Sequence, residues 1–131
     1  MKDSHVINDK IELWIEDGIL FAVLQEKLKI LTLENAKEIV ADRLKVSNGI
    51  SRPFIIDLSK LAKVDLEARK YMATGDAVKL LNATAILVKN QLTKLMANIY
   101  IRIYRPEIPT RFFENKEEAI LWLEKFKYNA N

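Results

Sequence analysis

One buried strand constrains the fold of this chain more than any other feature. Residues 52–59 contain the apolar run Phe54–Ile56, which ends at Asp57. A short run of aromatic and β-branched residues is typical of a strand covered on both faces. In open α/β sheets, ligands bind beyond the carboxyl ends of such strands. We therefore expect a binding site near Asp57 and Ser59, close to a helix that begins after Asp65.

The remaining hydrophobic pattern predicts further strands and helices on both sides of this strand. Alternating or continuous apolar runs predict the other strands, and Thr32, Asp65 and Asn115 are candidate N-caps of helices. Strands are expected at 10–16, 19–24, 83–88 and 110–113, and helices at 33–47, 66–73, 77–81, 91–104 and from 116 onward. The order is ββαβαβαβα, which predicts the α/β class: one five-stranded mixed sheet with four or five helices packed against it.

Length and charge limit the classes of function. With 131 residues the chain has room for one domain, and we assign residues 10–131 to it and residues 1–9 to a flexible N-terminal tail. The net charge is +3, from 21 basic and 18 acidic residues that are interspersed, so no nucleic acid is expected as a partner. No apolar run is long enough for a signal peptide or a membrane span, so we expect a cytoplasmic protein.

Most catalytic chemistry lacks the residues it requires. The chain has no cysteine, and its single histidine, His5, lies in the expected tail. Serine and cysteine triads and histidine-based metal sites therefore cannot be assembled. Neither GxxxxGK[ST] nor GxGxxG occurs, so phosphate-binding loops are absent. The sequence predicts a protein that is not an enzyme, with no catalytic residues, metal site or cofactor.

The two aspartates near the central strand have two interpretations. Asp57 can end the strand by accepting hydrogen bonds from nearby backbone amides, and Asp65 can cap the helix that follows it. Alternatively, both carboxylates border a binding site for a partner or ligand. The sequence leaves both interpretations open.

The helix expected at 91–104 has a wider apolar stripe than packing on a sheet requires. The stripe is flanked by the basic residues Lys94, Arg102 and Arg105. Such a face can pack in the core or against a second copy of the chain, bind an apolar ligand, or lie on an anionic membrane surface. The candidate membrane or dimer face consists of Met96, Ile99, Tyr100, Ile103, Tyr104 and Arg105.

The segment from Phe54 to Asp65 resembles the STAS domain, the fold of bacterial anti-sigma-factor antagonists. In that family a buried strand ends in Asp-Leu-Ser, as at Asp57–Ser59, and an apolar residue and an aspartate precede the next helix, as at Val64 and Asp65. The antagonists continue with a regulatory serine, whereas this chain has Leu66-Glu67-Ala68. The hydroxyl that a kinase would phosphorylate is therefore missing, and Glu67 either mimics its charge or only favours the helix dipole.

The carboxyl half resembles SpoIIAA-like, STAS/SEC14-type small bacterial proteins. The similarity lies in residues 100–105, in the proline-rich turn and Arg-Phe-Phe strand of 106–113, and in the Ala-x-x-Trp-Leu pattern of 119–123. The resemblance implies a single STAS/SpoIIAA-like domain and a non-enzymatic binding or regulatory module. Its protein partner would contact Asp57, Ser59, Asp65 and Glu67. The alternative is a protein that binds a small apolar ligand, or a lipid at the membrane surface, through the 91–104 helix.

Overall fold

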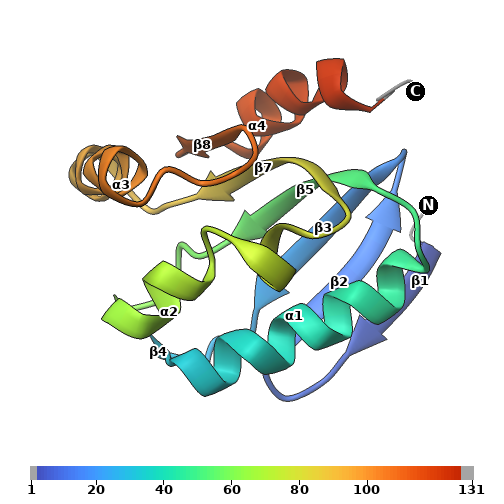
Figure 1. Cartoon of the computed structure of the whole chain (residues 1–131), viewed down its shortest axis with the longest axis horizontal. Coiled ribbons are helices and arrows are strands. Elements are labelled where there is room, and N and C mark those ends of the chain that lie inside the picture. The colour runs from blue at the N-terminus through green and yellow to red at the C-terminus, as the bar shows by residue number, and fades with distance from the viewer. Residues whose placement is uncertain (1–2, 128–131) are drawn as a thin grey trace.

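A six-stranded mixed sheet forms the centre of the molecule (Figure 1). The computed structural model describes residues 3–127, and of Asp3 and residues 91–97 it describes the backbone only. The sheet has the order β1 (Asp3–Ile7), β2 (Ile11–Glu16), β3 (Ile19–Leu24), β5 (Arg52–Asp57), β7 (Leu81–Leu87) and β8 (Thr110–Phe113). A separate parallel pair consists of β4 (Ile30–Leu31) and β6 (Lys63–Val64).

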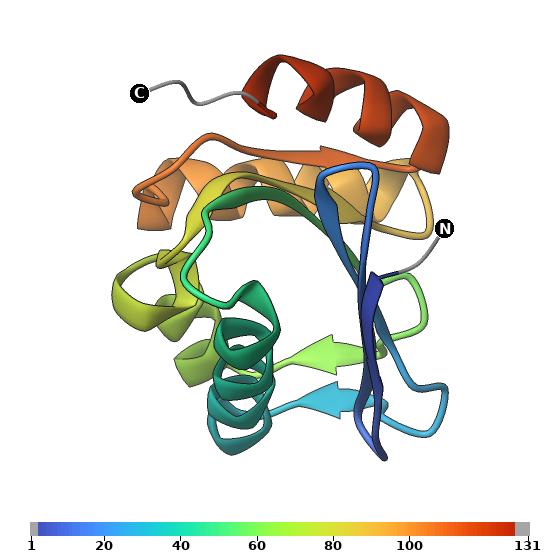
Figure 2. The ribbon, with the colours of Figure 1, turned by 90° about the vertical axis from the view of Figure 1, so that its right-hand side faces the viewer.

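The helices lie on both faces of this sheet (Figure 2). They are α1 (Leu33–Ser47), α2 (Leu66–Tyr71), α3 (Gln91–Tyr104) and α4 (Lys116–Leu123), with 3₁₀ turns η1 (Gly75–Val78) and η2 (Glu124–Phe126). α1 and α2 cover one face, and α4 covers the other. None of the helices in the described part of the chain is long and apolar enough to cross a lipid bilayer.

The central strand is the one that the sequence predicts. β5 pairs in parallel with β3 on one side and with β7 on the other, and its Phe54, Ile55 and Ile56 are all buried. Because successive side chains of a strand point to opposite faces, Phe54 and Ile56 face α1 while Ile55 faces α4. One strand therefore contributes to both halves of the core, as its continuous apolar sequence requires.

The β2–β3 hairpin is closed by a two-residue turn. Asp17 and Gly18 have φ of 52° and 78°, the left-handed values that a tight hairpin turn needs. The turn fixes the register in which Trp14 pairs with Phe21, and their rings stack at 5.2 Å on the α4 face. This stack belongs to the half of the core on the α4 face.

The N-terminal segment departs from the sequence prediction. Residues 1–9 are predicted to be a tail, which is wrong for Asp3–Ile7, because this segment is β1 and pairs antiparallel with β2. The main sheet therefore has six strands instead of five. As an edge strand whose described side chains are all exposed, β1 is held by its backbone and by a 2.6 Å contact between His5 Nε2 and Glu12 Oε2. Such a strand has no hydrophobic pattern from which it could be predicted.

Candidate functional site

Asp57 and Ser59 form a turn at the carboxyl end of β5. Asp57 Oδ1 accepts hydrogen bonds from the Ser59 backbone N–H at 2.8 Å and from the Ser59 hydroxyl at 2.5 Å. This is the local arrangement that an aspartate makes when it ends a strand. The bonds agree with the first interpretation of Asp57, and its role at a partner surface stays a prediction.

Asp65 and Glu67 lie at the start of α2. Asp65 occupies the N-cap position, but its side chain makes no capping hydrogen bond, and Asp65 Oδ1 lies 3.8 Å from Lys63 Nζ. Glu67 Oε2 lies 3.9 Å from Lys70 Nζ within the same helix. No hydrogen bond or ion pair of the described residues joins Asp57 and Ser59 to Asp65 and Glu67. Asp57 and Ser59 therefore bond to each other, whereas Asp65 and Glu67 each contact a lysine of their own segment.

A cavity of about 540 Å³ lies on the α1 side of the sheet. Its floor consists of alternate residues of β5, β7 and β8, and its walls come from the β6–α2 segment, from η1 and from α3. The floor residues are Phe54, Ile56, Thr84, Ile86, Thr110 and Phe112, and wall residues include Lys63, Val64, Arg69, Met72, Ala77, Val78, Tyr100 and Pro106. The lining is therefore mostly apolar.

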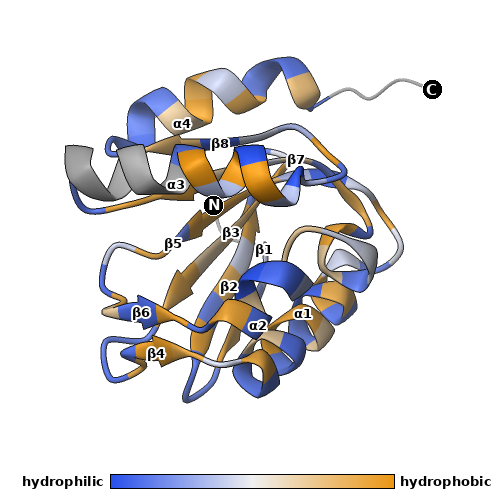
Figure 3. Ribbon diagram, turned by 60° about the vertical axis from the view of Figure 1, so that its left-hand side comes forward, coloured by the Kyte–Doolittle hydropathy of each residue, from blue (hydrophilic) through white to orange (hydrophobic). Residues whose placement is uncertain are grey.

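The two faces of β7 are covered to different degrees. The β7 residues that face α4, Ala83 and Ala85, are fully buried, whereas Thr84 and Ile86 on the cavity face remain partly exposed. A central strand covered closely on both faces would bury both sets. In Figure 3, α3 and β8 lie above this region, and α2 and β6 lie below it.

Tyr100 connects α3 to the opposite wall of the cavity. Its hydroxyl donates a 2.8 Å hydrogen bond to the Arg69 carbonyl of α2, and its ring meets Phe112 edge-on at 6.4 Å. Burial raises the pKa of Tyr100 to about 12, and the neighbouring Tyr104 adds to this rise while Arg69 opposes it. The hydroxyl therefore keeps its proton, and can donate this bond, throughout the neutral range.

The segment after α3 is attached to the same wall. Glu107 N–H donates to the Ala73 carbonyl at 3.1 Å, and Glu107 Oε1 accepts from Gly75 N–H at 3.2 Å. Arg105 has a left-handed φ of 46° and Pro106 follows it, so the helix ends there. The carboxyl half of α3 is thus fixed at both sides of the cavity.

The predicted membrane or dimer face of α3 divides into two sides. Tyr100 lines the cavity, whereas Ile99 and Ile103 are 43% and 64% exposed on the outer surface. Tyr104 is partly buried against Tyr100, Arg105 is exposed, and the Met96 side chain lies outside the described residues. The wide apolar stripe therefore serves one inner and one outer surface.

A buried arginine, which the sequence does not predict, supports the cavity wall. Arg43 of α1 is 1% exposed, and its Nη2 donates to the carbonyls of Asp76 at 3.1 Å and Ala77 at 3.3 Å. Its guanidinium lies 5.7 Å from the centre of the Phe54 ring, and Nη1 has no hydrogen-bond partner among the described residues. Burial lowers the pKa of Arg43 to about 10. The side chain fixes η1, which contributes Ala77 to the cavity wall.

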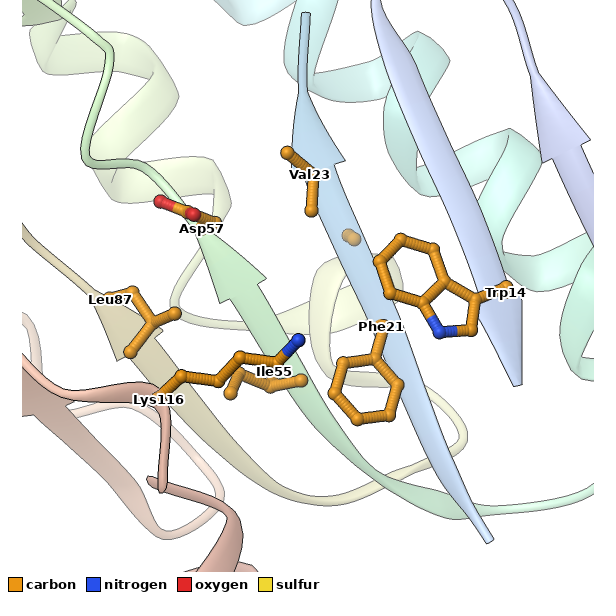
Figure 4. Close-up of a pocket in the computed structure, with 8 residues that line it drawn as sticks. Trp14, Phe21, Val23, Ile55, Asp57, Leu87 and Lys116 are labelled. Atoms are coloured by element: carbon orange, nitrogen blue, oxygen red, sulfur yellow. The ribbon is translucent and has the colours of Figure 1, made fainter. Parts of the chain in front are cut away.

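A second depression lies on the α4 face of the sheet (Figure 4). Figure 4 shows Lys116 extending over Ile55 toward Phe21, with Asp57 at the end of β5. Lys116 Nζ lies 5.3 Å from the Phe21 ring centre. The volume is about 40 Å³, which has room for a few water molecules and no organic ligand. No cluster of three or more His, Cys, Asp or Glu side chains in the described part of the chain could hold a metal ion.

A family model described as "Domain of unknown function (DUF7793)" matches residues 13–127. The chain belongs to this family. The matched range begins at Leu13 within β2 and includes all later elements up to η2. It therefore contains all residues that line the cavity. No curated protein matches the chain significantly.

The fold of this DUF7793 protein is similar to that of an uncharacterised protein of the DUF3478 family from Shewanella loihica PV-4, whose crystal structure is described as having a SpoIIAA-like fold. The two chains are 21% identical, the TM-score is 0.59, and the match covers 91% of this chain and 94% of the other. The predicted STAS/SpoIIAA-like fold is therefore confirmed. At this level of identity the comparison shows the fold alone.

Proposed function

We propose that this protein binds a small apolar ligand in the cavity between the sheet and α3, without transforming it. The observation that carries the proposal is the cavity of about 540 Å³ with its apolar floor. Ligand sites in proteins are typically clefts of roughly 300–1,000 Å³ lined by apolar and aromatic side chains with a few polar groups. Phe54, Ile86 and Phe112 provide such a floor.

The polar groups of the cavity favour binding over catalysis. Those near the floor are the hydroxyls of Thr84, Thr110 and Tyr100. The Thr110 hydroxyl already donates to the Ile108 carbonyl at 3.0 Å, and Tyr100, with a pKa of about 12, is a poor base at neutral pH. No nucleophile with an adjacent base is formed by these groups.

The protein-partner module that the STAS resemblance implies stays a prediction. At the position of the regulatory serine, Leu66 is 50% exposed beside Glu67. A constitutive surface of this kind could contact a partner but could not be switched by phosphorylation there. The cavity gives a more specific hypothesis, because its volume and lining define what it can accept.

The test uses a variant that fills the cavity. Thr84→Phe adds an aromatic ring to the floor in a β strand, where aromatic residues are well tolerated. We expect the neutral apolar dye N-phenyl-1-naphthylamine to bind the natural protein with increased emission and to lose at least tenfold in affinity for this variant.

The matched control is Thr74→Phe, since Thr74 is exposed and does not line the cavity. This variant should bind the dye like the natural protein, and circular dichroism should show that both variants are folded. Equal binding by folded Thr84→Phe would place the dye elsewhere and would contradict the proposal.

A further inference from the structure

Two basic side chains line the cavity. Among the described residues, its charged lining consists of Lys63 and Arg69 and includes no acidic side chain. Both lie in the β6–α2 segment, which Figure 3 shows well below β8. An apolar floor with two cations at one border is the arrangement that an amphiphile matches, with its tail over the floor and its head group at the border.

Arg69 is held so that the end of its guanidinium remains available. Arg69 Nε donates a 3.0 Å hydrogen bond to the Val64 carbonyl, which places the guanidinium beside β6. No described residue accepts a hydrogen bond from Arg69 Nη1 or Nη2. A carboxylate or phosphate oxygen is the group that a guanidinium binds best, through two parallel hydrogen bonds.

Lys63 lies in the same segment, and its ammonium makes only one long ion pair. Its ammonium is 3.8 Å from Asp65 Oδ1, and the two side chains are 65% and 39% exposed. Exposed pairs at such a separation contribute little and exchange readily with other partners. The ammonium can therefore reach an anion bound at Arg69 without breaking a strong contact.

We propose that the ligand of this cavity is a single-chain amphiphile with an anionic head group, which Lys63 and Arg69 bind while the tail lies on Phe54, Ile86 and Phe112. The proposal rests on the proposed function and adds the ligand class. A cationic head would meet two like charges at this border, and a neutral head would leave Arg69 without an anionic partner and Lys63 with only its 3.8 Å contact to Asp65. A free carboxylate and a phosphodiester both present the anionic oxygens that Lys63 and Arg69 would bind.

The test compares ligands that share one tail. Decanoate, decanol and decyltrimethylammonium would be titrated below their micelle-forming concentrations, and each would be measured by displacement of N-phenyl-1-naphthylamine. We expect decanoate to bind roughly tenfold or more tightly than either of the others, because a charge-assisted hydrogen bond adds about 1.4 kcal/mol or more, a factor of about ten. The advantage should decrease as salt is added.

Variants assign this preference to the two cations. Lys63→Gln with Arg69→Gln should reduce decanoate to the affinity of decanol and leave decanol unchanged. Arg69→Lys keeps the charge and should retain most of the preference. The control, Lys37→Gln with Arg102→Gln, removes the same charge from exposed positions that do not line the cavity and should change neither affinity.

The outcomes separate this inference from the proposed function. If all three ligands displace the dye equally well, the anionic head group is wrong while the apolar cavity stands. If the double variant keeps the decanoate preference, the binding of the head group by Lys63 and Arg69 is wrong. If no ligand displaces the dye and Thr84→Phe binds the dye unchanged, the proposed function itself fails. A further titration with monoacyl phosphatidylglycerol tests the phosphodiester source, and tighter binding than decanoate would favour a membrane-derived lipid as the anionic amphiphile.

Discussion

At the scale of single residues, Tyr100 determines how α3 is held over the cavity. One side chain contacts both walls, through its hydroxyl to the Arg69 carbonyl and through its ring to Phe112. A neutral hydrogen bond of this kind contributes about 1 kcal/mol, which is small for the whole protein but large for one helix end. This hydrogen bond is one of the contacts that hold α3, and it is lost when the Tyr100 hydroxyl gives up its proton.

The pH dependence of this bond follows from the pKa of Tyr100. Its folded pKa of about 12 lies above the ordinary value of 10, so the contribution to stability is complete below pH 10 and is lost as the pH rises from 10 to about 12. We expect the tyrosinate absorbance of the folded protein to show a late step near pH 12. Tyr100→Phe should remove that step, and Tyr104→Phe should retain it. If Tyr100→Phe instead removes a step near pH 10, the hydroxyl is not buried as described.

Arg43 marks a limit of prediction from single residues. It lies on the buried side of α1 and donates to carbonyls more than thirty residues later in the chain. A helix pattern assigns a charged residue to solvent unless a partner is known. Because these partners are backbone carbonyls of η1, no side chain in the sequence indicates where they are.

At the scale of elements, local signals predict the starts of α1, α2 and α4 correctly. The helix predicted at 77–81 is wrong, because the structure has the short turn η1 at Gly75–Val78 and β7 already begins at Leu81. α1 begins after Thr32, whose Oγ1 accepts from Asn35 N–H at 3.1 Å, and α4 begins after Asn115, whose Oδ1 accepts from Glu118 N–H at 2.9 Å. α1 ends at Asn48, with a left-handed φ of 51°. These features depend on residues within one turn of each other, so the sequence contains them.

The two N-cap residues Thr32 and Asp65 should respond differently to substitution. Thr32→Ala removes a side-chain capping bond and should lower the free energy of unfolding by about 1 kcal/mol. Asp65→Ala removes no capping bond and only a long contact to Lys63, so its effect should stay below about 0.5 kcal/mol. Urea unfolding of both variants gives the comparison. Equal losses would mean that Asp65 does cap α2 in solution.

The features that the sequence does not predict depend on distant segments. β1 pairs with the edge of β2, which would otherwise be open. The side chains of β1 show no hydrophobic pattern that would predict a strand. The cavity depends on the distance between α3 and β7, which the apolar stripe of the helix does not encode. The sequence therefore predicts Thr84 and Ile86 only as part of a buried strand, and it assigns no role to Lys63 or Arg69.

At the scale of the whole molecule, the sheet separates two unequal layers. On the α4 side, Ala119 and Leu123 pack on Ala83 and Ala85 with almost no exposed area. On the other side, the core under α1 is equally closed, but the region under α3 contains the cavity. The two layers therefore differ in how closely they pack against the sheet.

Hydrogen exchange should reproduce this division. We expect the slowest backbone amides in β3, β5 and β7 and faster exchange in β1, β4, β6 and α3, because local opening is easiest at edges and weakly packed elements. Addition of decanoate should slow exchange in β6, α2 and α3 and leave the β1–β2 hairpin and α4 unchanged. Uniform slowing of all elements would indicate global stabilisation without a site at this cavity.

The two indole rings have a practical consequence for spectroscopy. Trp14 stacks on Phe21, and Trp122 lies against Phe113 and Phe126, so both belong to the α4 layer. The sheet stands between them and the cavity. We expect their intrinsic fluorescence to report whether that layer is assembled and to stay constant when a ligand that does not absorb near 340 nm, such as decanoate, occupies the cavity.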